Sequence, residues 1–115
     1  MSADFRGFSH HALQDVFEVP WGALDEVRSE IESVLAVRLV AHESDYHGGD
    51  YFKGAIDGVD LVLQTNFVED DGEPTEAEFP DAAVLLYVNG AQAAVDGLRE
   101  VLLAHGARQL RTASW

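Results

Sequence analysis

Carboxylates are concentrated in one short stretch of this 115-residue chain. The 13 positions from Glu69 to Asp81 hold seven of the 21 acidic residues and no basic residue. Paired carboxylates can serve as general acid and base, but only where the fold holds them and separates their pKa values. Two prolines and one glycine here oppose both helix and strand. We therefore predict a long acidic loop, called the acidic segment below, and assign it no catalytic residue.

The acidic segment supports two interpretations. One is a solvated surface whose charge repulsion keeps the protein in solution. The other is a docking site that steers a basic partner, with Phe79 as an apolar anchor beside Glu78 and Pro80. Tyr46 and Tyr51 form a second candidate contact patch. The carboxylates that we predict to bind the partner are Glu69, Asp70, Asp71, Glu73, Glu76, Glu78 and Asp81.

A second chemical hypothesis concerns the loop at residues 45–50, where Asp45, His47 and Asp50 surround a glycine pair. These side chains are metal ligands in many proteins, and other histidines could join them if the fold brought them close. Their spacing matches neither a zinc-binding helix nor a calcium loop. The sequence therefore predicts no metal and no cofactor, and a small metal- or ligand-dependent enzyme using this loop remains the alternative.

Other kinds of active site find little support in the sequence. The chain has no cysteine, and none of its serines lies in a G-x-S-x-G turn. Its glycines form neither a phosphate-binding loop nor a dinucleotide fingerprint. We therefore expect a non-enzymatic protein.

The formal net charge of −14 opposes binding to nucleic acid and to anionic membranes, and it favours a basic protein partner. With 47% hydrophobic residues the chain can bury a core, and its length is that of a single domain spanning residues 1–115. No apolar run is long enough to cross a bilayer, and the N-terminal residues lack a signal pattern. Together with the absence of cysteine, this predicts a cytoplasmic protein.

The first half of the chain contains one predicted helix among strands. Residues 11–19 partly alternate and predict a strand, and Pro20 is placed to begin a helix that runs to Leu35 with apolar residues three and four apart. Residues 37–42 predict the next strand. A hairpin follows, because Asp57-Gly58 suits the tight turn that joins strands 51–56 and 59–67.

After the acidic segment, the apolar run 82–88 predicts a buried strand. Asn89 and Gln92 are spaced as a capping box for a second helix, which Gly106 would end. Residues 107–112 predict an edge strand that carries charge. The element order predicts an α+β fold: a two-layer sandwich with a mostly antiparallel sheet and two helices on one face, ferredoxin-like and elaborated by an extra strand.

Three stretches carry a resemblance: SDYHGGDYFKG at 44–54, LQTNF at 63–67 and FPDAAVLLYVNG at 79–90. They resemble a group of short, acidic bacterial proteins that are similar in size and acidity to immunity proteins. Immunity proteins neutralise secreted toxins, and many cover basic nuclease toxins with carboxylates. The resemblance implies a bacterial protein-binding domain that neutralises a basic toxin, and it assigns no role to any individual residue.

A further alternative is a dimeric regulatory domain, in which two copies of the chain form a homodimer through the open face of the sheet.

Overall fold

The computed structural model describes residues 12–44, 49–66, 76 and 78–114. In chain order these residues form six strands and two helices. The elements are β1 (Ala12–Glu18), α1 (Leu24–Leu35), β2 (Val40–Ser44), β3 (Gly49–Ile56), β4 (Val59–Thr65), β5 (Val84–Ala91), α2 (Gln92–Ala104) and β6 (Arg108–Ser114).

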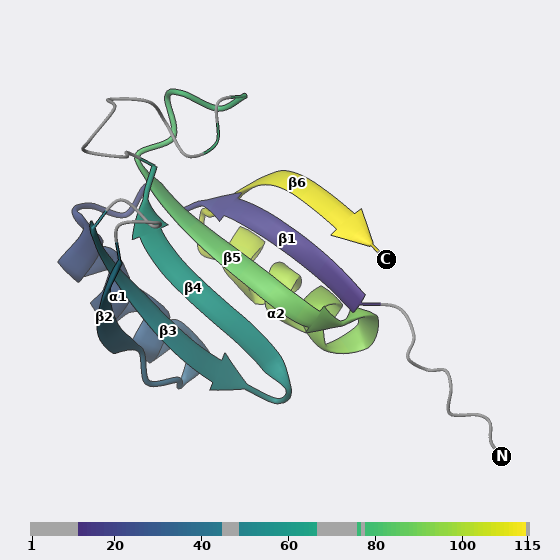
Figure 1. Ribbon diagram of the computed structural model, residues 1–115. Coiled ribbons are helices and arrows are strands. Elements are labelled where there is room, and N and C mark those ends of the chain that lie inside the picture. Colours follow the sequence, from purple (N-terminus) through teal and green to yellow (C-terminus); the bar gives the residue numbers. More distant parts are fainter. Residues whose placement is uncertain (1–11, 45–48, 67–75, 77, 115) are drawn as a thin grey trace, which may run out of the picture.

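The strands form one sheet in the order β2-β3-β4-β5-β1-β6, and every neighbouring pair is antiparallel. Both helices lie behind this sheet in Figure 1 and leave its other face open. The protein is therefore an α+β sandwich, as the element order predicts. Strands β4-β5-β1-β6 with the two helices are compatible with the ferredoxin-like arrangement, and β2 and β3 add two strands beyond β4 where one was expected.

The main hydrophobic core lies between the helices and the sheet. Alternate residues of each strand point toward the helices, because successive side chains of a strand lie on opposite faces. The two-residue turn predicted at Asp57-Gly58 is confirmed, and it sets Ile56 opposite Val59 and Phe52 opposite Leu63. Fully buried members of this core include Phe17, Val27, Ile31, Leu61, Leu63, Leu86, Val88, Val95 and Leu102. Within the described residues neither helix is long and apolar enough to cross a membrane.

Helix α1 begins at Leu24, four residues after the predicted start at Pro20. Gly22 adopts a positive φ of 134°, which a continuing helix does not allow. The Glu26 carboxylate instead accepts a hydrogen bond from the Ala23 backbone N–H at 2.8 Å and caps the helix. Ala36, with φ of 54°, ends the helix, so that β2 begins at Val40 and not at residue 37.

The predicted cap of α2 is also wrong. Asn89 lies inside β5, where it pairs with Gln14 and Asp60, and the helix begins three residues later at Gln92. The apolar run therefore continues as strand beyond Val88, because neighbouring strands on both sides extend the ladder. The helix end is as predicted: Gly106 has φ of 93°, and the His105 Nδ1 lies 2.9 Å from the Val101 carbonyl oxygen.

An ion pair inside the sandwich ties α2 to the sheet. Asp15 of β1 is fully buried, and its Oδ2 accepts a hydrogen bond from Arg99 Nε at 2.7 Å. Arg99 also bonds Asp96 on its own helix, at 2.7 Å. A buried carboxylate needs such a partner, because its transfer from water costs several kcal/mol. This pair therefore fixes how α2 lies across β1.

Candidate functional site

The described part of the acidic segment lies on the open face of the sheet. We call residues 76 and 78–82 the anchored stretch; in Figure 1 it precedes the start of β5. Phe79 packs there against a small apolar cluster that includes Val16, Leu85 and Leu110. These three side chains belong to β1, β5 and β6, and they point away from the helices. The anchored stretch thus covers one end of an otherwise open sheet face.

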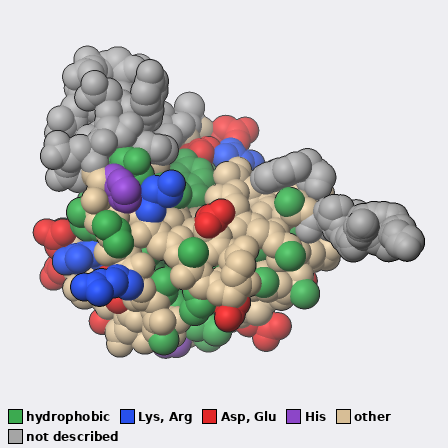
Figure 2. Space-filling view, turned by 60° about the horizontal axis from the view of Figure 1, so that its bottom comes forward, with side chains coloured by type: hydrophobic (Ala, Val, Ile, Leu, Met, Phe, Trp, Pro, Cys, Tyr) green, Lys and Arg blue, Asp and Glu red, His purple; other side chains and the backbone are tan. Residues whose placement is uncertain are grey.

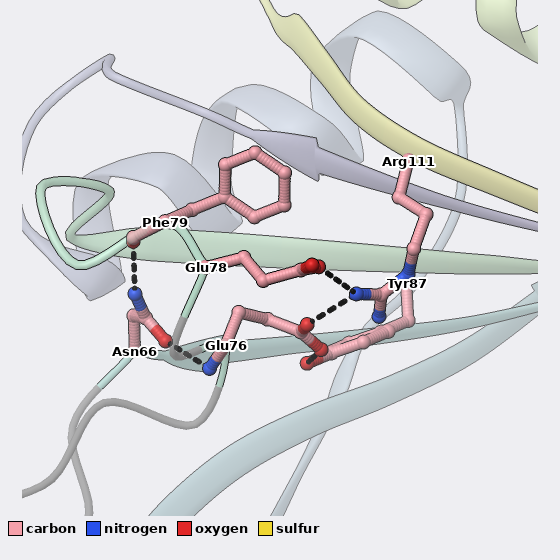
Figure 3. Close-up of polar contacts among 6 residues, drawn as sticks. All are labelled: Asn66, Glu76, Glu78, Phe79, Tyr87 and Arg111. Atoms are coloured by element: carbon pink, nitrogen blue, oxygen red, sulfur yellow. Dashed lines mark hydrogen bonds and ion pairs between the residues drawn. The ribbon is translucent and has the colours of Figure 1, made fainter.

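Asn66, just after β4, fastens this stretch at three points, two of which are drawn in Figure 3. Its amide Nδ2 donates hydrogen bonds to the carbonyl oxygens of Phe79 and Ala82, both at 2.8 Å. Its Oδ1 accepts a hydrogen bond from the Glu76 backbone N–H at 2.7 Å. Asn66 is only 4% exposed, and bonds to a buried amide are costly to break. The stretch is therefore held to the sheet through its backbone.

The side chain of Glu76 supplies the second attachment (Figure 3). Its Oε2 accepts a hydrogen bond from the Tyr87 hydroxyl at 2.6 Å, and its Oε1 lies 2.8 Å from Arg111 Nη1. The Glu76 side chain is 12% exposed, whereas that of Arg111 is 36% exposed. Tyr87 comes from β5 and Arg111 from β6, so the carboxylate joins the acidic segment to two strands.

The contacts among Glu76, Tyr87 and Arg111 determine how these three side chains ionise. Burial alone would raise the pKa of Glu76, but the hydrogen bonds from Arg111 and Tyr87 and the Arg111 charge outweigh it and lower that pKa. Burial, followed by the bond to the Glu76 carboxylate, raises the pKa of the Tyr87 phenol. The hydrogen bond to Glu76 raises the pKa of Arg111. At neutral pH the cluster is therefore an ion pair with a neutral phenol as a second donor.

Two carboxylates of the anchored stretch face outward. Glu78 is 76% exposed, and its only described contact is a long one, 3.5 Å from Arg111 Nη1. Asp81 is exposed as well. Glu76 differs from both, because its side chain is only 12% exposed and each of its carboxylate oxygens is already engaged, one by Arg111 and the other by the Tyr87 hydroxyl. The stretch therefore presents Glu78 and Asp81, while Glu76 holds it in place.

The other predicted contact residues are placed as follows. Glu69, Asp70, Asp71, Glu73 and Tyr46 lie outside the described residues. Phe79 is half-buried on the sheet. Tyr51 lies on the open face, where its ring stacks on that of His42 with centroids 5.4 Å apart.

Most of the residues in the metal hypothesis lie outside the part of the chain that the structure describes. Asp45 and His47 fall outside the described residues, and the side chain of Asp50 is not described either. Among the residues whose side chains are described, no group of three His, Asp or Glu side chains is close enough to bind a metal ion.

Sequence reasoning missed the residues that fasten the acidic segment. The sequence patterns place Asn66 near the end of the hairpin strand 59–67, Tyr87 inside the buried strand 82–88 and Arg111 in the edge strand 107–112. No local motif marks them, because their partners lie between 10 and 35 positions away in the chain. The available signal was the lone tyrosine in the otherwise apolar run 82–88.

The rest of the described surface gives less evidence about binding. Figure 2, which brings the lower side of the molecule forward, shows hydrophobic side chains scattered in small groups among the described residues. Among all described residues, Val40 of β2 is the most exposed large hydrophobic residue, at 53%. Scattered apolar residues are normal on a soluble protein's surface. The homodimer through the open face therefore stays a prediction.

Comparison with known proteins adds no relative: no family model, no curated protein and no solved structure matches this chain.

Proposed function

We propose that this protein is a non-enzymatic protein-binding domain, and that its acidic segment docks a basic protein partner. The observation that carries the proposal is the attachment of that segment. Asn66, Tyr87 and Arg111 hold one end of it against the sheet, and Glu78 and Asp81 point outward from the held stretch. The held stretch presents these two carboxylates from a fixed backbone, and this pre-organisation favours docking of a partner.

Electrostatics supports the same proposal. A chain with a net charge of −14 attracts a cationic protein over many ångströms, and clustered carboxylates orient the encounter. Holding the carboxylates in place lowers the entropy that they lose on binding. Pre-organised charge of this kind raises the association rate more than it raises the affinity.

Among basic partners we propose a toxin, so that the chain acts as a bacterial immunity protein. The support is the pattern resemblance of residues 44–54, 63–67 and 79–90 to short acidic proteins of this kind. The absence of cysteine fits a cytoplasmic location, where disulfides are rare. A bound immunity protein of this type would cover the toxin's cationic surface and block its access to nucleic acid.

The proposal is tested by two variants that change the net charge equally. The partner protein is first isolated by pull-down with the tagged chain from the cells that naturally produce this chain. The partner is then purified. One variant, Glu73→Gln with Glu78→Gln and Asp81→Asn, neutralises part of the acidic segment. The control variant, Asp57→Asn with Asp60→Asn and Glu100→Gln, neutralises three carboxylates on the β3–β4 hairpin and α2. The control carboxylates are all exposed.

We expect the acidic-segment variant to bind the partner with an association rate lower by roughly five- to tenfold at low salt. Its rate should also depend less steeply on salt concentration. The control variant should keep most of the wild-type rate. Equal losses in the two variants would show that only total charge matters, and a stoichiometric partner that is itself acidic would contradict the proposal outright.

A further inference from the structure

An open hollow of about 630 Å³ lies between the first half of α1 and the end of α2. It is lined by Trp21, Glu26, Ser29, Glu30 and His105. The Val19 N–H donates to the Val84 carbonyl at 3.1 Å, so the chain leading to Trp21 begins beside the start of β5. The hollow therefore lies at the same end of the sheet as the anchored stretch, on the helix side.

The polar groups around this hollow are mainly hydrogen-bond acceptors. Glu26 uses its Oε1 to cap α1, which leaves Oε2 available. The His105 Nδ1 lies 2.9 Å from the Val101 carbonyl oxygen, which can only accept, so Nδ1 is the donor in this contact. The indole N–H of Trp21 is buried and has no partner among the described residues, so it is not offered at the surface.

Two of these acceptors are carboxylates that repel each other. Glu26 and Glu30 stand four positions apart on α1, where side chains are neighbours and like charges are destabilising. Neither forms an ion pair with a described residue. Arg28, on the same helix, lies instead over the Phe52 ring in the core, 5.0 Å from its centroid. A cation in the hollow would relieve this repulsion.

We propose that this hollow binds one cationic side chain, an arginine guanidinium or a lysine ammonium, presented by the partner protein. Glu26 and Glu30 accept its N–H donors, and the Trp21 ring supplies an aromatic wall of the kind on which cations rest. The basic character of the partner rests on the proposed function. The hollow adds a specific pocket to the diffuse attraction of the acidic segment, and a buried cation on an aromatic ring is typical of an interface hot spot.

The test uses small molecules, so that its result does not depend on finding the partner. N-acetyl-arginine amide and N-acetyl-lysine amide are titrated into the full-length protein in 50 mM salt, and the Trp21 indole N–H signal is followed by NMR. The chain has two tryptophans, and a Trp115→Phe variant assigns their signals. N-acetyl-citrulline amide, which has nearly the shape of the arginine derivative but no charge, is the ligand control.

We expect saturable shifts of the Trp21 signal with at least one cation, at a dissociation constant on the order of 1–10 mM. The two cations distinguish which side chain the hollow accepts. Citrulline should give no saturable shift. If neither cation saturates the signal, or if citrulline acts equally, the hollow is not a cation site.

Matched variants separate the hollow from general charge. Glu30→Gln should weaken cation binding about fivefold or more, whereas Glu100→Gln, which removes one exposed carboxylate of α2 outside the hollow, should leave it nearly unchanged. The melting temperature of Glu30→Gln should equal or exceed that of the wild type, because a like-charge repulsion is removed. Equal losses in the two variants would overturn the proposal. Such a result would leave the role of the acidic segment intact, because that role is tested with the partner and with other residues.

Discussion

Replacing Arg111 by methionine tests how firmly the acidic segment is attached. Arg111→Met keeps much of the side chain's apolar length on β6 but removes the charge beside Glu76. The carboxylate would then keep only the Tyr87 hydroxyl as a donor, although its side chain is 12% exposed. Arg108→Met is the matched control, because Arg108 lies on the same strand and pairs with Glu18 at 2.8 Å, but its own side chain is 62% exposed.

The surroundings of the two ion pairs set the expected magnitudes. Exposed pairs contribute about 0.2–1 kcal/mol, and breaking a fully buried pair costs about 3–5 kcal/mol. The Glu76–Arg111 pair lies between these limits, so we expect Arg111→Met to destabilise the fold by about 2 kcal/mol. For a domain of this size that is a fall in melting temperature of roughly 8 °C. Arg108→Met should cost about 0.5 kcal/mol.

The effect should also depend on pH in a defined direction. The pKa of Glu76 is lowered in the fold from its ordinary value of 4.5, so its stabilising contribution is fully present above that pH. The contribution is lost as the pH falls through the folded-state pKa. Urea unfolding of the wild type and both variants should therefore show a gap for Arg111→Met at pH 7 that narrows below pH 4.5. Equal costs for the two variants at pH 7, or a gap that widens in acid, would refute the attachment as described.

Three further substitutions test the Asn66 attachment, the buried ion pair of β1 and the end of α1. Asn66→Ala should lower the free energy of unfolding by about 2–3 kcal/mol, because two carbonyls and one N–H each lose a hydrogen bond. Amide hydrogen exchange should quicken at Ala82, whose N–H donates to the Phe79 carbonyl; unchanged exchange there would contradict this. Arg99→Met should cost about 3–5 kcal/mol in urea unfolding, since it leaves the fully buried Asp15 with only a 3.4 Å contact to Gln109 Nε2; a cost below about 1 kcal/mol would show that the pair is dispensable. Ala36→Gly should raise the melting temperature by roughly 2–4 °C, because Ala36 ends α1 with φ of 54° and glycine adopts that conformation without strain.

The sequence predicted the fold where local patterns and tertiary packing agree. The Asp57-Gly58 turn fixes the hairpin register, since both residues take the positive φ that the turn requires. Alternation and helical spacing then place the core residues correctly. The errors lie at element ends, where tertiary pairing decides: Asn89 looks like a helix cap, but Gln14 and Asp60 draw it into the sheet.

The sequence predicted that the acidic segment is rich in carboxylates, but it did not predict how the residues of the candidate site are arranged in space. Seven carboxylates in 13 positions are visible in the sequence, yet they look alike there. What distinguishes Glu76 from Glu78 is a guanidinium 33 to 35 positions later in the chain, which only the strand order brings near. The hollow beside Trp21 was missed for the same reason, because His105, which follows α2 and lies far from Trp21 in the sequence, lines it.

The most direct test of the central claim is the association rate of the purified basic partner, measured against salt concentration for three forms of the chain. These forms are the wild type, the acidic-segment variant at 73, 78 and 81, and the control at 57, 60 and 100. We predict a slower rate and a shallower salt dependence in the acidic-segment variant alone. If that variant associates as fast as the control, the acidic segment does not dock the partner.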